Sequence, residues 1–329
     1  IGHGEGHALF DLRSFARPGP GRRDRLTPAA LEQITRTVRR APEVMVKVLT
    51  KGGQDLNAVE RHFSYLSRQG DLDIETDDGQ PLRGNEAGAD LLEEWDLDIE
   101  VDRRRMDLRA REDRVPPKLV HKVLFSMPPG TPANAVLQAV RDFAREEFAL
   151  KHRYAMVLHR DEPHPHVHMV IKALSHRGTR LNIRKDTLRD WRRKFAEQLR
   201  RQGVRANATE RAVRGGNRSR KLDGVYRAQQ RGQSTQIRRR ELVMAADMAR
   251  GSVHAVEGKS TLMATRREVG RGWQAVSDAL VEAGNHDLAH EVRRFVAAFP
   301  PPTTDREELA ADLASRSRYD REPRLPGDM

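Results

Sequence analysis

The strongest constraint on the fold is a pair of short apolar segments joined by a proline-containing turn. Residues 154–159 (YAMVLH) and 166–174 (HVHMVIKAL) have the composition of β-strands, and residues 161–163 (DEP) between them are typical of a turn. Together they predict a β-hairpin. Four of the 13 histidines of the chain fall within ten residues around this turn, namely His159, His164, His166 and His168.

The hairpin predicts a metal site. Side chains alternate along a strand, so His164, His166 and His168 share one face if the second strand extends that far. His159 lies on the partner strand and can meet them. Imidazoles that are neutral near pH 7 and held on rigid strands suit a divalent ion, and Asp161 is placed to orient one of them through its second nitrogen. Three histidines alone also fit a metallohydrolase that uses a bound water.

The hairpin is part of a longer pattern of strands and helices. Strands are predicted near residues 44–50 and 119–129, and helices at 56–69, 87–95, 133–149 and 188–203. This order predicts an α+β domain with a mainly antiparallel central sheet flanked by helices, over residues 43–205. Trp191 in the last helix is expected in the core.

The flanking regions differ in composition from this domain. Residues 1–42 are basic and rich in Gly and Pro, with one short helix expected after Thr27-Pro28, and we treat them as an N-terminal extension. Residues 206–329 are expected to form a basic linker followed by a mostly helical C-terminal region. The basic run at residues 200–240 includes Arg214, Arg218, Arg220 and Lys221, and fits either a solvated helix face or an arm that follows phosphates.

Composition narrows the classes of function. The chain has 60 Lys+Arg against 48 Asp+Glu, a formal net charge of +12. This favours a polyanionic partner, nucleic acid first and an anionic membrane surface second. It has no cysteine, which excludes disulfides, thiolate catalysis and Cys-ligated zinc. No apolar run is long enough to span a membrane and no secretory signal is visible, so we expect a cytoplasmic protein without membrane insertion.

Three ordered motifs resemble one known family. YLSRQGDLDIE at residues 65–75, SMPPGTPANAVLQAVRDFAREEF at 126–148 and LHRDEPHPHVHMVIK at 158–172 are similar to the motifs of the P-type conjugative and mobilisation relaxases. Those enzymes are HUH endonucleases, named for a His-hydrophobic-His triplet, which residues 166–168 match. The resemblance covers about residues 43–205 and implies the relaxase fold for that part of the chain.

The resemblance also implies roles for individual residues. Tyr65 corresponds to the nucleophile of the family. The metal ligands correspond to His159, His166 and His168, with His164 as an auxiliary residue. Asp161 corresponds to the acidic residue that orients a ligand or helps to deprotonate the tyrosine. The candidates for DNA contact, each of which also fits a solvated surface charge, are Arg68, Lys172, Arg184 and Lys185.

The implied reaction is the nicking of one DNA strand by transesterification. A phenol needs activation near neutral pH, and a His-bound Mg²⁺ or Mn²⁺ would polarise the scissile phosphate, although three imidazoles alone suit Mn²⁺ or Zn²⁺ better. Attack by Tyr65 leaves a 5′-phosphotyrosyl link and a free 3′-hydroxyl. The implied partners are single-stranded or locally melted origin-of-transfer DNA, relaxosome accessory proteins and a type IV coupling ATPase, with transfer of the protein into a recipient cell.

Two alternatives stay open. A rolling-circle replication initiator shares the HUH chemistry, but normally carries its tyrosine after the HUH triplet, whereas Tyr65 precedes it. A non-catalytic nucleic-acid-binding module with a structural metal would use the same histidines without a nucleophile. A covalent protein–DNA adduct distinguishes this module from both enzymes.

Overall fold

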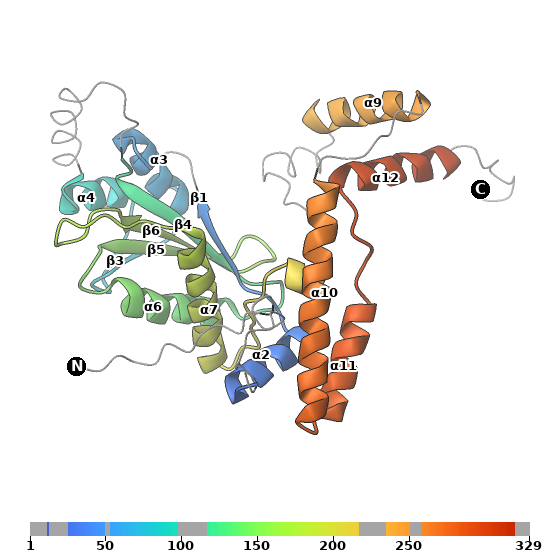
Figure 1. Ribbon diagram of the computed structural model, residues 1–329. Helices are drawn as coiled ribbons and strands as arrows, with labels where there is room; N and C mark the ends of the chain where they lie inside the picture. The colour runs from blue at the N-terminus through green and yellow to red at the C-terminus, as the bar shows by residue number, and fades with distance from the viewer. Residues whose placement is uncertain are drawn as a thin grey trace, which may run out of the picture. The chain divides into compact units, whose positions relative to one another are not determined.

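The computed structural model describes residues 12, 26–49, 53–97, 117–216, 235–250 and 258–319 (Figure 1). The chain divides into two compact units. Residues 39–208 form the unit that contains the β-sheet, here called the sheet unit. Residues 1–38 and 209–329 form the other, here called the helical unit.

The sheet unit is built on six strands in the order β1-β4-β6-β5-β2-β3, and every neighbouring pair is antiparallel. The strands are β1 (Met45–Leu49), β2 (Ile74–Thr76), β3 (Pro81–Leu82), β4 (Val120–Ser126), β5 (Tyr154–His159) and β6 (His166–Lys172). The predicted hairpin is therefore β5–β6, and the predicted strands near 44–50 and 119–129 are β1 and β4. The α+β class with an antiparallel sheet is confirmed.

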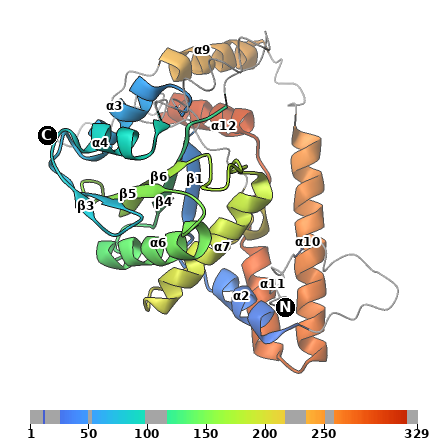
Figure 2. The ribbon, with the colours of Figure 1, turned by 90° about the vertical axis from the view of Figure 1, so that its left-hand side faces the viewer.

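Helices cover both faces of the sheet (Figure 2). The helices of this unit are α3 (Leu56–Leu66), α4 (Ala87–Glu94), α6 (Ala133–Phe148) and α7 (Lys185–Arg201). On one face α6 and α7 pack against Val123 and Val167, and Trp191 is fully buried there, as expected. On the other face α3 and α4 pack against Val157 and Val170.

The strand register places the histidines on the α3–α4 face. His159 is directly opposite His166 in the β5–β6 pair, and His168 is opposite Val157. Because facing residues of paired strands point to the same side, all three histidines share the face that carries Val157. Residues between them on β6, such as Val167, point into the other core. A shift of β6 by one residue against β5 would turn His166 and His168 to the opposite face and separate them from His159.

The helical unit has its own apolar core. Its elements are α2 (Pro28–Val38), the 3-10 turn η1 (Ala212–Arg214), α9 (Thr235–Ala249), α10 (Lys259–Glu282), α11 (His286–Ala297) and α12 (Asp305–Tyr319). Trp273 of α10 and Phe295 of α11 pack edge to face at 5.4 Å, and Ile34 of α2 belongs to the same cluster. The region that we predicted as an N-terminal extension thus contributes a helix to this core.

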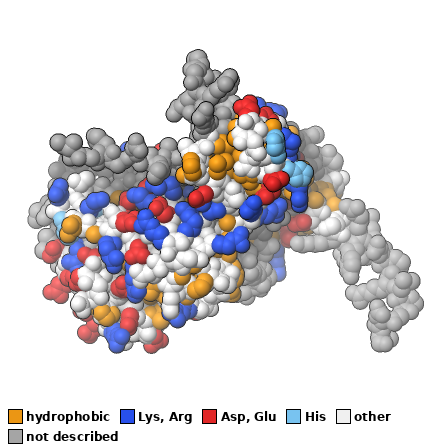
Figure 3. All heavy atoms as spheres, turned by 90° about the horizontal axis from the view of Figure 1, so that it is seen from below, with side chains coloured by type: hydrophobic (Ala, Val, Ile, Leu, Met, Phe, Trp, Pro, Cys, Tyr) orange, Lys and Arg blue, Asp and Glu red, His pale blue; other side chains and the backbone are white. Residues whose placement is uncertain are grey.

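The structure can be compared with what the basic composition and the lack of long apolar runs predict. Basic and acidic side chains are interspersed on the described surface seen from below, so that view does not show a field of a single sign (Figure 3). Arg218, Arg220 and Lys221 of the basic run lie outside the described residues, whereas Arg214 ends η1. In the described part of the chain, no helix is both long and apolar enough to cross a membrane.

Candidate metal and nucleophile site

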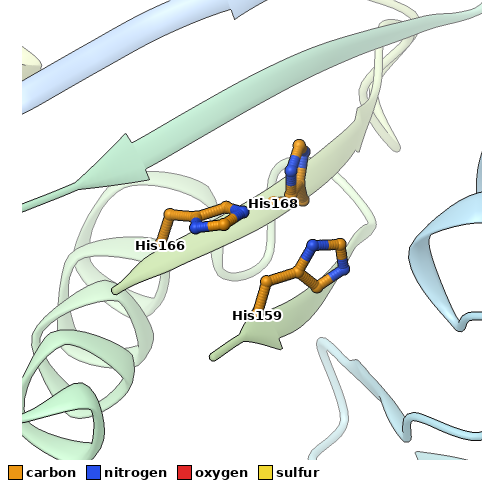
Figure 4. Close-up of side chains that lie close together, drawn as sticks. All are labelled: His159, His166 and His168. Atoms are coloured by element: carbon orange, nitrogen blue, oxygen red, sulfur yellow. The ribbon is translucent and has the colours of Figure 1, made fainter. Parts of the chain in front are cut away.

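Three histidines converge at the turn end of the β5–β6 hairpin (Figure 4). The ring centroids of His159 and His168 are 4.8 Å apart, those of His159 and His166 5.1 Å, and those of His166 and His168 5.3 Å. One nitrogen from each ring lies within 4.8 Å of the others, and all three residues are buried. The hairpin therefore brings together the three residues that the sequence proposes as metal ligands.

Hydrogen bonds determine which ring nitrogen of His159 and of His166 is available to bind a metal ion. A carbonyl oxygen only accepts, so the ring nitrogen that faces one must carry the proton. His159 donates from Nε2 to the Leu66 carbonyl at 2.9 Å, and His166 donates from Nδ1 to the His164 carbonyl at 2.9 Å. Their remaining nitrogens, Nδ1 of His159 and Nε2 of His166, each carry a lone pair that a metal ion can take. In the structure, Nδ1 of His159 faces a guanidinium nitrogen of Arg68 at 3.5 Å.

Burial keeps His159 and His168 in the form that a metal needs. The pKa of His168 is lowered to about 3, first by burial and then by the charges that His159 and His166 would carry. The pKa of His159 is lowered as well, chiefly by burial. Buried imidazoles with lowered pKa values are neutral at pH 7, and the neutral imidazole is the ligand form. The three imidazoles, two of which have a hydrogen-bonded second nitrogen, therefore fit a divalent ion.

Helix α3 presents Tyr65 to this cluster. The helix begins where the Asp55 carboxylate accepts a hydrogen bond from the Ala58 amide at 2.6 Å. Its apolar stripe, which includes Phe63 and Leu66, packs against the sheet, and burying each such side chain is worth roughly 1.5–3 kcal/mol. Tyr65 lies off this stripe and is 50% exposed, with its ring centroid 6.4 Å from that of His159.

Arg68 connects the tyrosine to the hairpin turn. It follows α3 with a φ of +53°, a left-handed conformation that directs it away from the helix path. Its guanidinium lies 5.0 Å from the centre of the Tyr65 ring, forms an ion pair with Asp161 and has one nitrogen 3.5 Å from Nδ1 of His159. The pKa of Arg68 is raised, first by a hydrogen bond with Tyr65, and Asp161 adds to this effect.

Asp161 is oriented toward Arg68. Burial alone would raise the pKa of this carboxyl, but its own backbone amide and the charge of Arg68 outweigh that effect, so the pKa of Asp161 is lowered. The sequence predicted that Asp161 would orient an imidazole. In the structure its carboxylate accepts a hydrogen bond from Arg68, the residue that lies beside Tyr65.

The remaining predicted residues are not gathered at the cluster. His164 is exposed and precedes β6, so it does not share the face of His166 and His168, and only its carbonyl enters the network. Lys172, at the far end of β6, donates to the carbonyl of Trp95. The other two, Arg184 and Lys185, are exposed at the start of α7, the helix that covers the opposite face of the sheet.

The sequence analysis missed His62. It lies one turn before Tyr65 on α3, its ring stacks on that of Tyr65 at 6.4 Å, and it meets the ring of His168 edge to face at 6.2 Å. The pKa of His62 is lowered to about 4, first by burial and then by the charges of Lys122 and His159. The signal was available, because residues three apart on a helix lie on one side of it.

Lys47 was missed for a different reason. In the register, Lys47 of β1 faces Leu124 of β4, and Leu124 in turn faces His168 of β6. Lys47 therefore lies on the histidine face, two strands from His168, or about 10 Å at the usual strand spacing. The alternation in MVKVL shows that Lys47 and Met45 lie on the same face of β1. Only the pairing of β1 with β4 shows that this is the face of the sheet that carries the histidines.

This chain is similar in sequence to known relaxases. Residues 85–204 match the family model of the MobA/VirD2-like relaxase nuclease domain. The T-DNA border endonuclease VirD2 of Rhizobium radiobacter is 27% identical over 188 residues, 53% of this chain and 43% of that protein. The resemblance to VirD2-like relaxases is confirmed. VirD2 of Agrobacterium fabrum (strain C58 / ATCC 33970) is 27% identical over 210 residues, covering 60% of this chain and 46% of that protein.

The family match includes only part of the candidate site. The VirD2-like match over residues 85–204 includes the hairpin with its histidines and Asp161, but begins after Tyr65. The role of Tyr65 therefore depends on its motif and on its position beside the cluster. The chain also spans less than half the length of the curated VirD2 relatives that it matches.

Proposed function

We propose that this chain is a relaxase that nicks one strand of DNA by transesterification at an origin of transfer. The observation that carries the proposal is the position of Tyr65 beside the three buried histidines, with Arg68 between the tyrosine and the hairpin turn. The VirD2-like match supports a DNA-nicking enzyme. A non-catalytic module has no need of an exposed tyrosine at this point.

The reaction exchanges one phosphodiester for another. The Tyr65 oxygen forms a bond to the scissile phosphorus and loses its proton to solvent or a nearby base, while the bond from phosphorus to the 3′-oxygen breaks. The departing 3′-oxygen takes a proton and becomes a hydroxyl, and the 5′-phosphate stays on Tyr65. The number of phosphoester bonds is unchanged, so the reverse reaction can reseal the strand without ATP.

The residues at the site divide this work. When bound, a divalent ion held by His159, His166 and His168 supplies electrostatic stabilisation for charge on the phosphate. Arg68 provides a fixed positive charge beside the tyrosine, where it stabilises negative charge that develops on the attacking oxygen and the phosphate. Asp161 holds the Arg68 guanidinium in place through their ion pair. The metal is Mg²⁺ or Mn²⁺ in this proposal.

The substrate is single-stranded or locally melted DNA. Arg68, at the site itself, is the best-supported phosphate contact, and Lys47 extends a positive charge along the same sheet face. Lys172, Arg184 and Lys185 stay sequence predictions for DNA contact. Relaxosome accessory proteins and a type IV coupling ATPase complete the proposed partners, with action in a bacterial cytoplasm and transfer to a recipient cell.

Two rival functions make different demands. A rolling-circle initiator would use the same adduct chemistry to begin replication, whereas a structural-metal module would bind DNA and leave it intact. The experiment uses a pool of single-stranded oligonucleotides with a randomised 20-nucleotide segment and a fluorophore at the 3′ end. The protein is incubated with this pool and Mn²⁺ and then run on an SDS gel.

The expected result is a fluorescent band at the position of the protein, because the 3′ fragment stays attached through its 5′-phosphate. The band should be absent with Tyr65→Phe, which keeps ring packing and removes only the nucleophilic oxygen. Sequencing of the captured DNA then gives the nick site, and its position at a transfer or a replication origin distinguishes the two enzymes. DNA binding without any adduct would refute the relaxase and favour the structural-metal module.

A further inference from the structure

Two of the three clustered histidines have a hydrogen-bond partner for their second ring nitrogen, and the third, His168, does not. A metal-bound imidazole normally donates its other N–H to an acceptor, which fixes the ring and raises its basicity. His159 and His166 have such acceptors in two backbone carbonyls, each at 2.9 Å. His168 differs, because its Nδ1 is buried and has no hydrogen-bond partner among the described residues.

A second buried nitrogen without a partner lies beside it. Nε2 of His62 is also buried and unbonded among the described residues, and the rings of His62 and His168 meet edge to face at 6.2 Å between centroids. A buried polar atom without a hydrogen-bond partner destabilises the folded state. Two such atoms on neighbouring rings at the same site indicate a contact that forms when the site is in its working state.

We propose that His62 is a positioning residue that accepts a hydrogen bond from Nδ1–H of His168, so that His168 offers Nε2 to the metal. The three ligands would then each have an acceptor for the second nitrogen. This inference rests on the metal site of the proposed function. It assigns to His62 a role that neither the motifs nor the family resemblance specifies.

The geometry allows this contact with little movement. The rings of His62 and His168 lie edge to face with their centroids 6.2 Å apart, which leaves the two nitrogens close but not yet bonded. A ring rotation and a small shift make this a direct hydrogen bond, and one bridging water makes it an indirect one. The anchoring of His62 on α3 by neighbours such as Phe63 limits any larger movement.

His62 also contacts the nucleophile. Its ring lies nearly parallel to that of Tyr65, with an interplanar angle of 16° at 6.4 Å. One side chain thus touches both the metal-ligand cluster and the tyrosine. His62 therefore links the orientation of His168 to the position of the Tyr65 ring.

The two contacts can be separated by substitution. His62→Phe keeps an aromatic ring beside Tyr65 and removes the acceptor, whereas His62→Gln keeps an acceptor oxygen and removes the ring. The primary measurement is the Mn²⁺ dissociation constant by titration calorimetry at pH 7.5, with no DNA present. The matched control is His290→Phe, which replaces an exposed histidine on α11 of the helical unit.

His62→Phe should weaken Mn²⁺ binding at least tenfold, as is typical when the hydrogen-bond partner of a ligand is lost. His62→Gln should stay within threefold of the wild type, and His290→Phe should not change. At saturating Mn²⁺ the rate of adduct formation should be lower in His62→Gln than in His62→Phe, because His62→Gln lacks the ring beside Tyr65. Thermal unfolding in EDTA confirms that each variant is folded.

The outcomes separate this inference from the proposed function. Equal Mn²⁺ affinity of the wild type and His62→Phe would overturn the role of His62 even if the wild type forms the adduct. Equal losses in His62→Phe and His62→Gln would also overturn it. If His62→Phe alone weakens Mn²⁺ binding but no protein forms an adduct, the role of His62 holds and the relaxase fails. A wild type that binds no Mn²⁺ would refute both.

Discussion

Acidification should destabilise the sheet unit through its buried histidines. The pKa values of His62 and His121 are each lowered to about 4, and that of His168 to about 3, mainly by burial. In the unfolded chain a histidine titrates near pKa 6.5. Below that pH the unfolded state binds more protons than the folded state, so stability falls as the pH decreases from about 7 toward 4.

The magnitude follows from these pKa values. Between pH 7.5 and 5.0, a histidine that protonates only on unfolding costs about 2 kcal/mol of stability. The three histidines together give an upper bound of about 6 kcal/mol. His168→Gln is neutral throughout this range, so we expect it to reduce the pH-dependent loss by about 2 kcal/mol. His290→Gln, which replaces an exposed histidine of the helical unit, is the matched control variant.

The assay is urea unfolding in EDTA at pH 7.5 and 5.0, followed by tryptophan fluorescence. Trp273 belongs to the helical unit, whereas Trp95 and Trp191 belong to the sheet unit. A Trp273→Phe background therefore makes the signal specific for the sheet unit. A pH-dependent loss of stability in His168→Gln as large as in its parent would refute the argument that His168 is held neutral by burial.

Three further outcomes follow from the site. His166→Ala should weaken Mn²⁺ binding at least tenfold in calorimetry and abolish the adduct. His164→Ala should have a much smaller effect on both, because only the carbonyl of His164 contacts the network. Equal losses in the two variants would mean that the ligand set is wrong. Arg68→Gln should slow adduct formation strongly, whereas Arg68→Lys, which keeps a positive charge beside Tyr65, should slow it less. Equal losses in these two Arg68 variants would argue against a charge effect. Lys47→Ala should lower the slope of log affinity for single-stranded DNA against log salt by about 0.7, and an unchanged slope would remove Lys47 from the DNA path.

The hairpin and its ligands were predictable because they depend on local pattern. Two short apolar segments joined by a turn that contains DEP are expected to pair as a hairpin, and alternation then determines which histidines face together. His159, His166 and His168 needed only this two-strand register. The failure to place His164 with them came from the strand beginning at His166, after Pro165. Proline cannot donate to a sheet, so the ladder begins after it.

The rest of the site depends on contacts between segments far apart in the sequence. Arg68 and Asp161 meet only because α3 packs across β5, and no spacing rule gives that docking. Lys172 was proposed for a phosphate, yet it donates to Trp95, a residue whose position follows from how α4 ends. His62 shows the intermediate case, because its side of α3 was predictable and its contact with His168 was not.

The most direct test of the central claim is to identify the residue that carries DNA. After reaction with the oligonucleotide pool, the adduct is digested with nuclease and trypsin, and the modified peptide is sequenced by mass spectrometry. The account predicts that the nucleotide remnant is on the peptide HFSYLSR, residues 62–68, at Tyr65. A remnant on any of the other tyrosines, Tyr154, Tyr226 or Tyr319, would contradict it.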